Sequence, residues 1–138
     1  MDVSERFEQL IAFLESQLPG PVDQQTLADS SMQFTGGDPP TVVALLTHTS
    51  VVVSEFAGVW ETLFSFVAKP RRVGIVKWRR LPENALLAAI SALIKGAREA
   101  RLAAFQTCKF CGQRTAPEWL SDEGTCQSCA DQQSGRVH

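Results

Sequence analysis

The chain has 138 residues, of which 44% are hydrophobic and 20% are charged, and its formal net charge is −2. These values are typical of a soluble globular protein, and the length suits one domain with a small additional unit. No apolar run approaches the roughly 18 residues that a membrane-spanning helix needs, so we expect no membrane partner. The acidic, amphipathic N-terminus differs from a secretory signal peptide, and we therefore expect a cytoplasmic protein.

Charge is distributed unevenly along the chain. Residues 1–68 carry nine acidic side chains and one basic one, whereas residues 69–80 (KPRRVGIVKWRR) carry six basic side chains and no acidic one. The low net charge therefore conceals an acidic N-terminal half and one concentrated basic segment.

The first predicted element is an amphipathic helix that starts near Asp2 and ends before Pro19-Gly20-Pro21. Asp2 with Glu5 suggests a capping box at its start. Its apolar side chains recur every three or four residues, which places them on one face. We expect this face to pack against a core, with a partner-binding helix as the alternative. The apolar residues are Val3, Phe7, Leu10, Ile11, Leu14 and Leu18.

β-Branched runs in the middle of the chain predict a small antiparallel sheet of three to five strands. Residues 41–47 (TVVALLT) and 51–56 (VVVSEF) are separated by a break of hairpin length. A further strand is expected at 73–78 (VGIVKW), and 36–40 (GGDPP) predict a turn or loop. Residues 59–68 fit either a strand or a helix.

Residues 82–106 predict the longest helix, which leads directly into the cysteine-rich C-terminal region. Pro82 suits a first helical turn, and Glu83 complements the positive end of the helix dipole. One face of this helix is apolar and is expected to meet the core. It consists of Leu86, Leu87, Ile90, Leu93, Ile94 and Ala97.

All four cysteines lie in two Cys-x-x-Cys pairs, Cys108 with Cys111 and Cys126 with Cys129, and fourteen residues separate the pairs. A two-residue spacing lets a tight turn direct both thiolates at one ion. Two such turns supply the four sulfurs of a tetrahedral structural site. Gly112 permits the backbone turn after the first pair. We therefore predict one structural Zn²⁺ held by the four cysteines.

Other uses of four thiols fit this pattern less well. A redox dithiol needs only one pair and lies near the start of a helix in a βαβ unit. A catalytic zinc needs an open coordination position, which four thiolates do not leave. An iron–sulfur cluster stays an alternative, although the even spacing of the pairs favours zinc. Disulfides are disfavoured in a reducing cytoplasm.

Residues 108–130 resemble a zinc ribbon or a related two-knuckle module, through CKFCG in the first pair and CQSCA in the second. Ala130 departs from this pattern, because a glycine often follows each pair. The resemblance implies a metal-centred tail, residues 108–138, after a body that comprises residues 1–107. It also implies that the metal would order the loop around Trp119, which is therefore a candidate partner-binding loop.

The predicted fold is α+β. It combines an N-terminal amphipathic helix, a small antiparallel sheet, a long helix and a C-terminal zinc ribbon. We see no catalytic motif in the sequence: it lacks a Gly-rich phosphate loop, a G-x-S-x-G elbow and an H-E-x-x-H pair. Its two histidines, His48 and His138, have no evident acid–base partner. We therefore expect no enzyme activity and no small-molecule substrate.

Two binding functions follow from the charge pattern. We favour a protein-interaction protein, of the acidic immunity or inhibitor type that neutralises a partner such as a toxin. An acidic N-terminal half would steer such a protein toward a basic partner.

The alternative is a nucleic-acid-binding regulator that uses the basic segment 69–80 together with the zinc ribbon. Cations neutralise phosphates, and an interleaved aromatic ring can stack on a base. The same charges would also protect an edge strand from aggregation, which is the simpler interpretation. The candidate nucleic-acid or partner-binding residues are Arg71, Arg72, Lys77, Trp78, Arg79 and Arg80.

Overall fold

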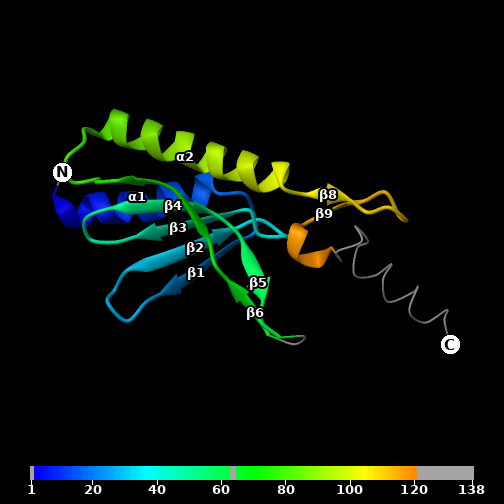
Figure 1. Ribbon diagram of the computed structural model, residues 1–138. Coiled ribbons are helices and arrows are strands. Elements are labelled where there is room, and N and C mark those ends of the chain that lie inside the picture. Colours follow the sequence, from blue (N-terminus) through cyan, green and yellow to red (C-terminus); the bar gives the residue numbers. More distant parts are fainter. Residues whose placement is uncertain (1, 63–64, 121–138) are drawn as a thin grey trace.

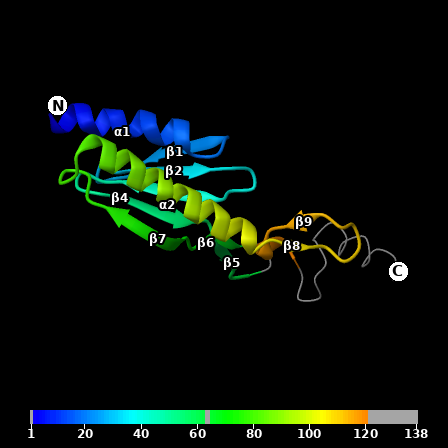
Figure 2. The same cartoon turned by 90° about the horizontal axis from the view of Figure 1, so that it is seen from above.

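A computed structural model describes residues 2–62 and 65–120 of the chain. Within these residues, two helices cover one face of a five-stranded antiparallel sheet, so the body has two layers (Figures 1 and 2). The strand order across the sheet is β1-β2-β3-β4-β7. This arrangement confirms the predicted α+β body. The sheet strands are β1 (Val22–Thr26), β2 (Met32–Gly36), β3 (Val42–Leu46), β4 (Val51–Glu55) and β7 (Arg71–Val76).

Helix α1 (Val3–Gln17) forms as its sequence predicts. The side chain of Asp2 accepts a hydrogen bond of 2.8 Å from the backbone N–H of Glu5, which satisfies one of the amides at the helix start. Leu10 and Leu14 are fully buried. The apolar face of this helix therefore packs into the core, as expected.

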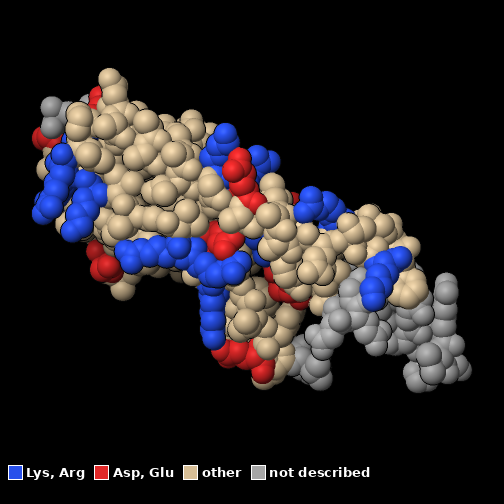
Figure 3. Space-filling view, turned by 45° about the horizontal axis from the view of Figure 1, so that its top comes forward, with Lys and Arg blue, Asp and Glu red and all other residues tan. Residues whose placement is uncertain are grey.

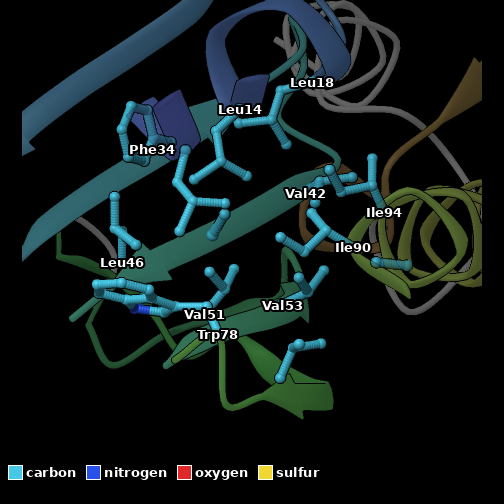
Figure 4. Packing of buried hydrophobic residues seen from close by; sticks show 14 of the residues in the cluster. Leu14, Leu18, Phe34, Val42, Leu46, Val51, Val53, Trp78, Ile90 and Ile94 are labelled. Carbon is cyan, nitrogen blue, oxygen red and sulfur yellow. The ribbon is translucent and has the colours of Figure 1, made fainter. Parts of the chain in front are cut away.

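The two central strands, β3 and β4, pair in register with Leu46 opposite Val51 and Val42 opposite Glu55. Alternate side chains of a strand point to opposite faces, so Val42 and Leu46 face the helices. Figure 4 shows this core, in which the ring of Trp78 and side chains from α1, the sheet and the second helix meet. The predicted hairpin 41–56 is confirmed.

Residues 59–68 have a sequence that fits strand or helix, and both regular elements that the structure describes within this range are strands. A separate two-stranded hairpin consists of β5 (Gly58–Trp60) and β6 (Phe66–Ala68). It leaves the main sheet between β4 and β7, and a hydrogen bond of 2.7 Å from Lys69 N–H to Ala57 C=O closes its base. The hairpin extends beside residues 117–119 (Figure 1).

Helix α2 (Glu83–Ala103) begins after Pro82 and lies across β4 and β7 (Figure 2). Gly74 of β7 allows this close approach, because a Cβ there would come within 2.6 Å of the Leu93 side chain. The buried face of α2 contains Leu86, Ile90, Ile94, Ala97 and Arg101. Among the described residues, neither helix is both long enough and apolar enough to cross a membrane.

The described part of the tail follows α2 directly. Strands β8 (Gln106–Thr107) and β9 (Arg114–Thr115) form a small antiparallel hairpin, and a 3₁₀ turn, η1 (Pro117–Trp119), follows it. The first of these strands therefore lies just before the predicted boundary at residue 108. We refer to residues 106–120 as the tail.

Candidate functional site

The first Cys-x-x-Cys pair lies at the tip of the β8–β9 hairpin in a tight turn. The backbone N–H of Phe110 points at the sulfur of Cys108, with an N···Sγ distance of 3.4 Å. Gly112 adopts a φ of +73°, a conformation that favours glycine, and its N–H donates to the C=O of Cys108 at 3.1 Å. An amide directed at sulfur stabilises the thiolate form, which is the form that binds metals.

The donor set of this turn suits a metal knuckle. Cys108 is buried and Cys111 is exposed. Cys126 and Cys129 lie outside the described residues, and within 2–62 and 65–120 no three metal-ligating side chains cluster. The four-cysteine zinc site therefore stays a prediction, whose first half has a suitable backbone conformation.

A buried ion pair joins the tail to the body. The guanidinium of Arg101, on α2, makes a bidentate pair with the carboxylate of Glu118, on η1, including an Nη1···Oε2 distance of 2.9 Å. Only 3% of the Arg101 side chain and 5% of the Glu118 side chain are exposed. Arg101 Nε also donates to the C=O of Pro40 at 3.1 Å. One arginine thus links α2, the turn before β3 and the tail.

Aromatic rings surround this ion pair. The guanidinium of Arg101 lies 5.2 Å from the ring centre of Phe56 and 5.0 Å from that of Phe105, distances suited to cation–π attraction. Arg114 donates to the C=O groups of Leu102 and Phe105, near the end of α2. Because the last carbonyls of a helix lack helical partners, these bonds fasten the tail hairpin to the helix terminus.

A second contact between body and tail consists of aromatic side chains. The indole N–H of Trp60, on β5, donates to the C=O of Glu118 at 2.9 Å. The ring centres of Trp60 and Trp119 lie 5.4 Å apart in an edge-to-face arrangement, and Phe66 stacks beside Trp119 at 6.4 Å. Aromatic rings prefer edge-to-face and offset-stacked arrangements at such centre-to-centre distances, so these contacts stabilise the docking of the tail. We call Trp60, Phe66 and Trp119 the aromatic surface.

The aromatic surface remains open to solvent despite these contacts. Trp60 is 39% exposed and Trp119 is 41% exposed. The candidate partner residue Trp119 therefore does lie at the surface, beside two aromatic side chains of the body. No local sequence pattern predicts that Trp60 and Phe66 join it, since their strands are short and far from the tail in sequence.

The pair of Arg101 and Glu118 was also missed. Arg101 follows Ala97 by four residues and Ile94 by seven, so it continues the apolar stripe of α2. An arginine on the buried face of a helix needs a partner, and this signal was available.

The basic segment lies along one edge of the molecule, where Lys and Arg side chains gather (Figure 3). Arg71 and Arg72 belong to the edge strand β7, and Lys77, Arg79 and Arg80 follow it in a turn. This position fits the edge-strand interpretation.

Trp78, the aromatic member of the candidate set, is fully buried. Its indole N–H donates to the C=O of Thr47 at 2.9 Å, and the guanidinium of Arg79 lies 5.5 Å from its ring centre. The ring belongs to the core, so the expectation that it could stack on a base is wrong. It is also larger than the other core side chains, which explains why burial is favourable.

A groove of about 550 Å³ lies between the end of α1 and α2. Its polar lining includes Gln17, Ser91, Lys95, Arg98 and Glu99. This lining includes neither a histidine nor a cysteine. His48, in the β3–β4 turn, lies elsewhere and stacks on Phe7 with ring centres 5.3 Å apart.

Comparison with known proteins adds no family. No protein-family model matches the chain, and no curated protein or solved structure matches it significantly.

Proposed function

We propose that this chain is a non-enzymatic, zinc-containing protein-interaction protein whose partner binds the aromatic surface. The observation that carries the proposal is the pair of exposed tryptophans, Trp60 and Trp119, held in edge-to-face contact across the body and tail. Tryptophan is enriched among the residues that dominate protein–protein binding energy.

Buried and hydrogen-bonded contacts hold the two exposed tryptophan rings in place, which favours a binding role for them. The buried pair of Arg101 and Glu118 fixes η1 against α2, and the indole N–H of Trp60 is already satisfied by the Glu118 carbonyl. A preorganised aromatic pair loses little conformational entropy when a partner binds, so more of the contact energy contributes to affinity.

Zinc has a structural role in this proposal. Cys108 and Cys111 would hold it together with Cys126 and Cys129, and four thiolates leave no site for substrate. A bound Zn²⁺ would supply rigidity to a hairpin that has few apolar side chains of its own. The metal would thereby keep Trp119 beside Trp60.

The acidic residues suggest the charge of the partner. Asp2, Glu5, Glu8 and Glu15 are all exposed along α1. Their field would speed the approach of a basic protein. This property supports the immunity or inhibitor type of function, in which the chain neutralises a partner such as a toxin.

The test is a comparison of tagged proteins in cells that express the chain. Wild type should recover one stoichiometric protein, and Trp60→Ser with Trp119→Ser should lose it. Val3→Ser is the control, since it removes an exposed apolar side chain on α1, away from these rings, and should retain the partner. Equal recovery by all three proteins, or no recovery by wild type, would contradict the proposal.

A nucleic-acid-binding regulator is the second candidate, supported by the cations gathered at the β7 edge. It predicts oligonucleotide binding that weakens steeply with salt and disappears when Arg71, Arg72, Arg79 and Arg80 are neutralised together. Absence of binding to DNA and RNA at low salt would rule it out. The burial of Trp78 removes one of its supports.

A further inference from the structure

Strand β7 is the terminal strand of the main sheet. It pairs with β4 along one side, and within the described residues no strand pairs with its other side. Its six residues would extend over about 20 Å at the usual rise of a strand. An unpaired edge of this length presents backbone N–H and C=O groups to any extended chain that can approach it.

The centre of β7 has no charged side chain and no proline, and a register shift between Val53 and Ser54 of β4 leaves Val73 without a partner in the strand pairing. Natural edge strands are commonly blocked by charges, especially lysines, by proline or by β-bulges, so of these devices the centre of β7 has the bulge alone. Here the middle residues are Val73, Gly74 and Ile75, of which Val73 is 40% exposed and Ile75 is 44% exposed. The cations lie at the two ends of the strand instead. The cations therefore flank the edge of β7 and leave the backbone at its centre accessible to another extended chain.

Several of these cations have no ion-pair partner among residues 2–62 and 65–120. Arg71 pairs with Glu55 at 2.7 Å, and Lys69 pairs with Glu61 at 3.7 Å. In the part of the chain that the structure describes, no carboxylate lies within ion-pair distance of Arg72. The same holds for Lys77. Both side chains are exposed, one at each end of the strand.

We propose that β7 accepts an extended acidic segment of a partner protein, which adds to the sheet beside it. Main-chain hydrogen bonds to the centre of β7 would supply affinity, as in other cases of strand addition. Carboxylates of the segment would lie near Arg72 at one end and Lys77 at the other, and apolar side chains would cover Val73 and Ile75. This charge complementarity fixes the sign of the partner segment.

Other occupants fit the edge less well. Antiparallel pairing of two copies through β7 would place arginines of one copy near cations of the other, which is unfavourable. A nucleic acid would meet the cations, but the centre of the strand offers Val73 and Ile75 in place of an aromatic ring, and Trp78 is buried. The binding edge is also separate from the aromatic surface, so the two proposals can fail independently.

The probe is a fluorescein-labelled synthetic peptide in which glutamate and valine alternate, and fluorescence anisotropy reports its binding to the full chain. Arg72→Glu with Lys77→Glu should weaken binding by about tenfold or more. Lys95→Glu with Arg98→Glu, on α2, changes the net charge equally and should leave binding within about twofold. Circular dichroism of both variants checks that each remains folded.

A second peptide separates strand pairing from charge attraction. N-methylation of alternate residues keeps the glutamates but removes backbone donors, so this peptide should not bind detectably. Equal binding of the methylated and unmethylated peptides would overturn the proposal, as would no binding of the unmethylated one at low salt.

Two further outcomes would also overturn the proposal. One is an oligonucleotide of equal charge that binds more tightly than the peptide, with sensitivity to the Arg72 and Lys77 changes. The other is edge-mediated self-association of the chain, seen by sedimentation, that excludes the peptide. The variant Trp60→Ser with Trp119→Ser should bind the peptide as tightly as wild type. Failure of the aromatic-surface proposal would therefore not affect the test of β7.

Discussion

The body buries a continuous cluster of apolar side chains from both helices and the sheet, whereas the tail buries the Cys108 sulfur, the small side chain of Ala116 and the carboxylate of Glu118. Burial of apolar area stabilises the first region throughout. The second depends on a few specific contacts. The body and the tail are therefore stabilised by different interactions, and single substitutions should destabilise one region without the other.

The largest expected effect is on the tail. Cys108→Ser should abolish stoichiometric zinc binding, because structural zinc contributes about 10–16 kcal/mol of apparent free energy in small zinc modules. Metal analysis of the purified protein measures the loss, and tryptophan fluorescence should report a changed environment of Trp60 and Trp119. The far-UV circular dichroism of the body should persist.

Lys109→Ser is the control for this change, since it lies in the same turn and supplies no thiolate. Retention of one zinc per chain by Cys108→Ser would contradict the four-cysteine site. Collapse of the body signal would contradict the independence of the two regions.

The next largest effect is on the body. Phe34→Ala removes a fully buried ring from the core and should lower the free energy of unfolding by about 3–5 kcal/mol. Urea titration measures the change. The neighbouring Gln33→Ala, whose side chain belongs to the other face of the sheet, should change stability by less than about 0.5 kcal/mol. Similar losses in both variants would show that the assigned faces of β2 are incorrect.

Sequence periodicity predicted the parts of the body in which burial repeats regularly. In both helices apolar residues recur every three or four positions, and in the hairpin of β3 and β4 two runs of β-branched residues flank a short turn. The prediction missed β1 and β2. Val22–Thr26 contains a single apolar residue, Val22, which packs against the core, and pairing with β2 defines the rest of the strand. Edge strands of this kind carry little hydrophobic signal.

The candidate site was predicted only where its chemistry is local. The Cys108–Gly112 turn depends on neighbouring residues, so its spacing was sufficient to predict a knuckle conformation. The contacts of Glu118 with Arg101 and Trp60 span 17 and 58 positions, and no local pattern encodes such distances. Trp78 was misassigned because adjacent arginines suggested exposure, although its ring completes the core.

An intermediate effect tests the junction between body and tail. Glu118→Ala leaves the Arg101 guanidinium buried without its carboxylate and should destabilise the docked tail by about 3 kcal/mol. Hydrogen exchange of residues 106–120 would measure this loosening. The double change Arg101→Leu with Glu118→Leu should recover much of the loss, because no buried charge remains. Glu99→Ala, an exposed carboxylate on α2, is the control and should have little effect.

A smaller effect is expected at the start of α1. Asp2→Ala removes the oxygen that caps the Glu5 amide and should cost about 1 kcal/mol of stability. Asp2→Asn retains a capping oxygen and should remain close to wild type. Thermal unfolding of the three proteins tests this order, and equal melting temperatures would show that the cap contributes nothing.

The smallest effect concerns pH. The N–H of Ser31 donates to the carboxylate of Asp29 at 2.9 Å and holds the pKa of that exposed carboxyl below its ordinary value. A lowered folded-state pKa stabilises the protein above the ordinary carboxyl pKa, and this contribution is lost as the pH falls through the folded-state value. Asp29→Ala should therefore show a slightly flatter loss of stability below about pH 4. Superimposable acid titrations would contradict this assignment.

The hairpin of β5 and β6 has a consequence for how this protein can change over evolution. It is an excursion between two neighbouring strands, and its base is closed by the contact of Lys69 with Ala57. A change in its length or sequence would alter the platform on which Trp119 rests while β4 and β7 keep their register. New partner preferences could thus arise at this hairpin without any cost to the packing of the core.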